Sequence, residues 1–172
     1  MAKANRATIA AERILRASGA SVPVDIERIA RAHSLEVIYR PMEETVSGML
    51  VIKEKRAIAC INARHHPHRR RFTLAHELGH YLLHGERVRV FIDASPIFFR
   101  DERASCGTDQ REVEANRFAA SLLMPEAALR EMVGAGPFDL FDDRAMQRLA
   151  AQFGVSPQAM AIRLAALGLG AL

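Results

Sequence analysis

The chain has 172 residues, of which 49% are hydrophobic and 26% charged, and its formal net charge is +4. These values are typical of a globular protein with a domain-sized core. No apolar run approaches the ~20 residues that a membrane span requires. The first 20 residues also lack the apolar core of a signal peptide, so we expect a cytoplasmic protein. Two cysteines, Cys60 and Cys106, exclude a disulfide framework.

The first forty residues predict two helices and a strand. Apolar residues recur at helical spacing over Asn5–Ser18, and Gly19 follows as a helix-ending residue. A second helix is expected from Pro23 to about His33. Leu35–Tyr39 is rich in β-forming residues, and Pro41 ends that strand.

A β-hairpin is expected next. Val46–Ile52 and Ala57–Ile61 are apolar runs, separated by the charged turn Lys53–Arg56. Such a hairpin can offer an edge on which an extended peptide adds as another strand. It can equally be an edge strand that its charges protect from pairing, and the sequence leaves both interpretations open.

The segment Arg69–Gly85 contains the pattern H-E-x-x-H at His76, Glu77 and His80. Residues four apart lie on the same face of a helix, so the two imidazoles can converge on one metal ion. Glu77 flanks the pair and can reach a water on the metal. At 100° per residue, a ligating and solvated flank is expected to hold Thr73, His76, Glu77, His80 and His84, and a buried flank Leu74, Ala75, Leu78 and Leu82.

Other residues of this region receive simpler interpretations. Gly79 lies between the two flanks, where a missing side chain lets another element approach closely. Arg69–Arg71 is expected to form the solvated first turn of the helix, and the histidines from His65 to His68 a surface turn.

The pattern weakens between Glu86 and Asp109. Val88–Ile92 is compatible with a short strand and Pro96–Phe99 with an apolar loop. This segment could form a lid or a specificity loop over the metal, or a connection whose phenylalanines fill the core.

Asp109–Pro125 predicts a second helix with ligating residues. Glu112 and Asn116 are four apart and share a face, whereas Glu114 points away and is interpreted as solvent-facing or paired with an arginine. Glu112 is therefore the candidate third metal ligand. Asn116 is suited to accept the free ring N–H of a ligating imidazole. His84 competes for the third position, but three histidines in a row along one helix cannot surround a tetrahedral ion.

Two imidazoles and one carboxylate leave a fourth position for water, as in a catalytic zinc site, although Mn²⁺ is not excluded. Such a site suits hydrolysis of a peptide bond, with Glu77 as general base. Tyr39, His84 and the arginines are candidates for stabilising the oxyanion. Cys106 lies six residues before Glu112 and carries one further hypothesis, that its thiolate occupies the open position and keeps the enzyme latent.

Two helices are expected near the C-terminus. Asp142 or Asp143 can cap a helix that runs to about Phe153, and Ser156 with Pro157 starts a last helix that ends before Gly168. Together they resemble a helix-turn-helix. The last helix offers only two residues that could read bases, so we expect packing or substrate docking here rather than nucleic-acid binding. These two residues are Gln158 and Arg163.

The motifs RFTLAHELGHYLLH and E-x-E-A-N-x-F-A-x-x-L-L-M-P together resemble the ImmA/IrrE family of zincin-like metallo-endopeptidases, from about Pro23 to Leu169. The resemblance implies an α+β, zincin-like fold, with a small, mostly antiparallel sheet packed on the HExxH helix. Residues 1–135 would form the metallopeptidase domain and 136–172 a helical C-terminal subdomain, or part of the same domain. In the family the first glutamate of the second motif is a metal ligand, which corresponds to Glu112.

The resemblance also implies a substrate. Members cleave a helix-turn-helix repressor at one site, so the expected partner is a protein, with no membrane contact and an oligomeric state left open. The alternative class is a non-catalytic regulator, antitoxin-like or DNA-associated, on the same scaffold. Glu77 favours the enzyme, because a purely structural metal site needs no general base.

Overall fold

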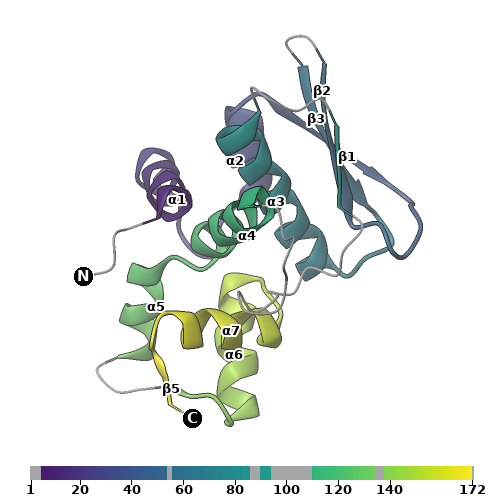
Figure 1. Ribbon diagram of the computed structural model, residues 1–172. Coiled ribbons are helices and arrows are strands. Elements are labelled where there is room, and N and C mark those ends of the chain that lie inside the picture. The colour runs from purple at the N-terminus through teal and green to yellow at the C-terminus, as the bar shows by residue number, and fades with distance from the viewer. Residues whose placement is uncertain (1–4, 54–55, 86–89, 94–109, 135–137, 172) are drawn as a thin grey trace.

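The computed structural model describes residues 5–53, 56–85, 90–93, 110–134 and 138–171. Within them the chain is a mixed α+β protein, with helices gathered on one side of a four-stranded sheet (Figure 1). None of the described helices is long and apolar enough to cross a membrane. The elements in chain order are α1 Arg6–Ser18, α2 Ile26–Ala32, β1 Leu35–Arg40, β2 Gly48–Lys53, β3 Arg56–Asn62, α3 Pro67–His84, β4 Val90–Asp93, α4 Gln110–Leu123, α5 Glu126–Val133, β5 Phe138–Asp139, α6 Asp143–Phe153, α7 Pro157–Ala166 and β6 Gly170–Ala171.

The two N-terminal helices form where the sequence predicts them, with one difference at the start of α2. Asn5 caps α1 by accepting from the Ala7 N–H, and Gly19 ends that helix in the left-handed conformation. Pro23 does not open α2. The helix begins three residues later, where the Asp25 side chain accepts from the Arg28 N–H.

The main sheet has the strand order β1-β3-β2-β4, in which β1 runs parallel to β3 and the other two pairings are antiparallel. The hairpin β2–β3 is confirmed, but both interpretations of it as a sheet edge are wrong. Each hairpin strand has a neighbour on either side, and β1 and β4 are the outer strands among the described residues. Apolar alternation within a strand does not encode which strand pairs with it, so the sequence could not give this order.

Helix α3 lies between the sheet and α4 and contacts β2 and β3 on one side and α4 on the other (Figure 1). Phe72 to His80 are all buried. The expectation of a solvated flank is therefore wrong for the middle of the helix, because β2 covers Thr73 and Glu77 while α4 lies against His76 and His80. Polar side chains here are functional candidates, since burying them without a partner is costly.

The arginines at the start of α3 are also not simply solvated. Arg71 donates to the carbonyl oxygens of Val24 and Gly154, at 2.8 and 3.1 Å. Arg69 donates to Oγ of Ser47 at 2.7 Å. These contacts tie α3 to three other parts of the chain, so the prediction of a solvated turn is wrong.

The C-terminal helices form as predicted. Asp142 caps α6, Ser156 caps α7, and Gly154 turns the chain between them in the left-handed conformation. Arg163 is buried, and its Nε donates to the carbonyl oxygen of Met124 at 3.2 Å. This segment shares one hydrophobic core cluster with the rest of the protein, from Ala7 to Leu169.

Candidate metal centre

Two helices bring the three predicted ligands together. His76 and His80 lie one turn apart on α3, and Glu112 lies in the first turn of α4. Nε2 of His76 is 2.9 Å from Nε2 of His80, and the Glu112 carboxylate oxygens lie 3.3 and 3.2 Å from these two nitrogens. One ligating atom from each residue thus lies within 4.8 Å of the others.

These separations fit a tetrahedral metal ion. With Zn–N and Zn–O distances of 2.0–2.2 Å, ligand atoms on a tetrahedron stand roughly 3.3–3.6 Å apart. The separations of 2.9 to 3.3 Å lie at or slightly below the lower end of this range. The donor set of two imidazoles and one carboxylate is that of an open zinc site rather than a closed structural one.

Asn116 fixes the orientation of one imidazole. It lies one turn after Glu112 on α4, and its Oδ1 is 2.9 Å from Nδ1 of His76. An amide oxygen only accepts, so Nδ1 carries the proton and Nε2 keeps its lone pair for a metal. The residue therefore lies where the sequence placed it, behind a ligating histidine.

Burial and charge shift the pKa of two of the three candidate ligands. Burial lowers the pKa of His80, and the neighbouring His76 adds to this effect, whereas hydrogen bonding to Glu112 opposes it. Burial by itself raises the pKa of Glu112, but its interactions with the His76 and His80 rings outweigh burial, and the net pKa lies below the ordinary value. Neutral imidazoles and an ionised carboxylate are the forms that bind a metal ion.

The members of the site differ in burial. His76 and His80 are 2% and 1% exposed, while the side chain of Glu112 is 40% exposed. Glu77 is fully buried, and its Oε1 faces the start of β2 at Gly48. Among the described residues, Glu112 is therefore the most exposed of the three candidate ligands.

Gly79 permits the close packing that joins the two helices. A methyl group at this position would lie 3.0 Å from Cδ1 of Phe118 and 3.2 Å from Cα of Ala115, both on α4. The prediction that a missing side chain lets another element approach here is confirmed. The glycine lies between His76 and His80, so it lets α4 bring Glu112 against them.

Of the remaining candidates, Tyr39 lies away from the cluster, whereas the ring centroid of His84 lies 5.9 Å from that of His80. The Tyr39 hydroxyl donates to Oε1 of Glu27 at 2.7 Å, which directs it toward α2. His84 lies 3.6 Å from Oε2 of Glu114, whose side chain is 17% exposed, so the interpretation of Glu114 as solvent-facing is wrong. Cys106 and the expected loop Pro96–Phe99 lie outside the described residues.

The segment after α3 gives one strand among the described residues. The prediction of a short strand over Val88–Ile92 is confirmed in part, since β4 spans Val90–Asp93 and pairs with β2. Sequence reasoning missed Gly48 of β2, where a Cβ atom would lie 3.2 Å from Oε1 of Glu77. An isolated glycine at a strand end often marks the close approach of another element, and that signal was present.

Comparison with known proteins agrees with this geometry. Residues 30–165 match the IrrE N-terminal-like domain, the model of peptidase family M78. The chain is also similar to an "Uncharacterized immunity region protein 2" of Bacillus phage phi105, at 28% identity over 117 residues, which are 68% of this chain and 67% of that protein. The matched span includes both motifs that carried the resemblance, and the family suggests a metallopeptidase role. The chain belongs to the ImmA/IrrE family of peptidases.

Proposed function

We propose that this protein is a zinc-dependent endopeptidase that cleaves one peptide bond in a regulatory protein, and that the substrate is a helix-turn-helix transcriptional repressor. The observation that carries the proposal is the meeting of His76, His80 and Glu112 within 4.8 Å. Glu77, one residue from the first ligand, is fully buried. A carboxylate held in such a place fits a chemical role better than a structural one.

Each residue has a distinct part in the proposed mechanism. His76, His80 and Glu112 would hold the zinc ion, which when bound would acidify a water and polarise the peptide carbonyl. Asn116 keeps the His76 ring in the tautomer that leaves Nε2 free. The Glu77 carboxylate takes the proton of the attacking water and passes it to the leaving amine. Mn²⁺ can take the same donors.

The substrate class has separate support. A metallopeptidase acts on a protein or peptide, and the phage relative is described as a protein of an immunity region. A repressor is the regulatory protein that the family resemblance points to. The buried position of Arg163 removes one of the two base-reading residues of the last helix, which supports a protein partner over direct nucleic-acid binding.

The test compares wild-type protein with Glu77→Gln. Both are loaded with zinc and incubated with any helix-turn-helix repressor found to be encoded beside this gene, and the products are identified by mass spectrometry. The wild type should make one defined cut. The variant should cleave roughly 10²–10⁴-fold more slowly, because it has lost its general base, while zinc content by elemental analysis stays unchanged.

A matched control variant distinguishes the loss of the general base from the general effect of replacing a glutamate near the site. Glu114→Gln alters a glutamate that pairs with His84 outside the ligand cluster, and it should cleave like the wild type. A repressor that stays intact with zinc-loaded wild type, but binds both proteins equally well, would instead support the non-catalytic regulator.

A further inference from the structure

The first residue of β2, Gly48, is buried against α3 where that helix carries Glu77. A methyl group at Gly48 would lie 2.5 Å from Cγ2 of Thr73 and 3.2 Å from Oε1 of Glu77. It would also lie 3.2 Å from the carbonyl oxygen of Cys60, the residue of β3 that precedes its register partner Ile61. No side chain fits between the strand and the helix at this point.

Space, and not backbone conformation, explains the glycine. The described glycines with positive φ are Gly19, Gly134, Gly154 and Gly168, and Gly48 is not among them. Any residue can adopt its extended conformation, and glycine is otherwise disfavoured in a strand. What glycine provides here is the absence of a Cβ atom.

Two side chains of α3, Thr73 and Glu77, lie against Gly48, and they have different roles. Thr73 and Glu77 are four residues apart, so they lie on the same face of the helix. The methyl group of Thr73 accounts for general packing of α3 on the sheet. The other contact involves the carboxylate of Glu77, which must be held in a fixed position if it acts as the general base of the proposed reaction.

We infer that Gly48 is a positioning residue for Glu77. The bare backbone at the start of β2 forms one wall of the space that holds the Glu77 carboxylate, and it fixes the direction from which that carboxylate meets the attacking water. The catalytic part of this inference rests on the proposed function. The close packing of Gly48 and Glu77 does not depend on that function.

The strand is well anchored, so it can serve as a fixed wall. Gly48 pairs with Ile61 of β3 and with Asp93 of β4. The preceding Ser47 is buried, accepts a hydrogen bond from Arg69 of α3 on its Oγ, and accepts another from the Asn62 N–H on its carbonyl oxygen. A side chain added at Gly48 must therefore displace Glu77 or Thr73 rather than the strand.

The first experiment measures the contact without any activity. Gly48→Ala is introduced into a Thr73→Ser background, which removes the nearest methyl group, and into a Thr73→Ser, Glu77→Ala background. Thermal unfolding is followed for the zinc-free proteins. In the first background Gly48→Ala should lower Tm by at least about 3 °C, as overpacking does in a buried site. In the second, the loss should fall to less than half, because the crowded carboxylate is gone.

The second experiment measures catalysis by Gly48→Ala, with the repressor or, failing that, the fastest-cleaved member of a proteome-derived peptide library. A displacement of a few tenths of an ångström should lower kcat about tenfold and leave KM and zinc content unchanged. Met49→Ala is the control, because Met49 points to the opposite face of β2. It should lose stability but retain kcat.

Equal Tm losses in the two backgrounds, within about 1 °C, would overturn the contact between Gly48 and Glu77. An unchanged kcat, or a raised KM at constant kcat, would overturn the positioning role. If zinc-loaded wild type cleaves nothing while the Tm coupling is present, the proposed function fails and the catalytic meaning of Gly48 fails with it, but the packing contact stands.

Discussion

Replacement of Gly79 by alanine changes the free energy of unfolding in two opposite ways, through helix propensity and through overpacking. Alanine is favoured over glycine in a helix by about 1 kcal/mol. The new methyl group, however, meets Cδ1 of Phe118 at 3.0 Å and the backbone of Ala115 at 3.2 and 3.3 Å. Overpacking of this kind costs about 1–3 kcal/mol, and backbone atoms cannot rotate away. We expect a cost near the upper end, and a net destabilisation of about 1.5 kcal/mol.

The net cost has two measurable consequences. Tm should fall by roughly 3–6 °C, at 2–4 °C per kcal/mol for a chain of this size. The strain is relieved by separating α4 from α3, which moves Glu112 away from His76 and His80. If metal binding must restore the closer packing, the binding free energy of zinc becomes less favourable by about 1.4 kcal/mol. The zinc Kd should then be about tenfold higher.

The assay combines thermal unfolding of zinc-free protein with chelator competition for zinc. In a Phe118→Leu background, which removes the nearest contact, the Tm loss caused by Gly79→Ala should be smaller than in wild type but not zero, because the contacts with Ala115 remain. A rise in Tm of 2–4 °C with unchanged zinc affinity would show that helix propensity alone governs this position. It would refute the argument that Gly79 sets the spacing of the two helices.

Two further predictions concern Asn116 and Tyr39. Asn116→Ala should weaken zinc affinity roughly 10–100-fold, because it removes the acceptor at 2.9 Å from Nδ1 of His76; Asn116→Asp should retain most of it, and equal affinities for all three proteins in chelator competition would contradict this. Burial and the hydrogen bond to Glu27 raise the pKa of Tyr39 to about 12 from an ordinary 10.0. The folded state therefore holds this proton more tightly than the unfolded state, and the stability it contributes is present below pH 10 and is lost as pH rises toward 12. Tyr39→Phe should remove that part of the alkaline decline in Tm, and parallel profiles for the two proteins would count against it.

The ligand geometry could be predicted because it depends on local periodicity. Spacing of four residues on a helix places His76 above His80, and the same rule places Glu112 and Asn116 on one face of α4. Caps at Asn5 and Ser156 were readable for the same reason. Each depends on residues within one or two turns of the chain.

The features that failed depend on distant parts of the chain. Strand β2 and helix α4 cover a flank of α3 that periodicity assigned to solvent, and β1 and β4 take the outer places that the hairpin was expected to hold. Arg71 finds its acceptors at Val24 and Gly154, 47 and 83 residues away. Sequence patterning shows which side chains need partners, but it does not show where those partners lie.

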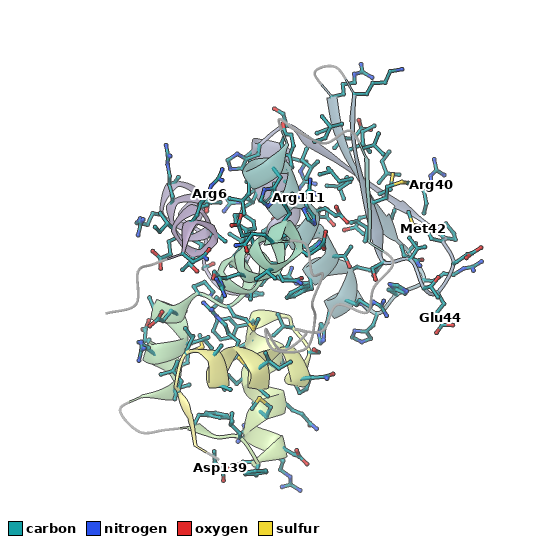
Figure 2. All side chains as sticks on the ribbon, viewed as in Figure 1. Arg6, Arg40, Met42, Glu44, Arg111 and Asp139 are labelled. Atoms are coloured by element: carbon teal, nitrogen blue, oxygen red, sulfur yellow. The ribbon has the colours of Figure 1, made fainter. Side chains whose placement is uncertain are left out.

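Helix α1 precedes the stretch that matches the family, which begins at residue 30. It nevertheless packs along α4, and its Arg6 donates to the carbonyl oxygen of Leu83 at the last turn of α3 (Figure 2). A protein trimmed to residues 30–165 would expose the apolar side of the helix that supplies Glu112, and would leave the end of α3 without this donor. The span that the family model matches is thus shorter than the span that packs together in this chain, and a shortened version of the protein should retain its first helix.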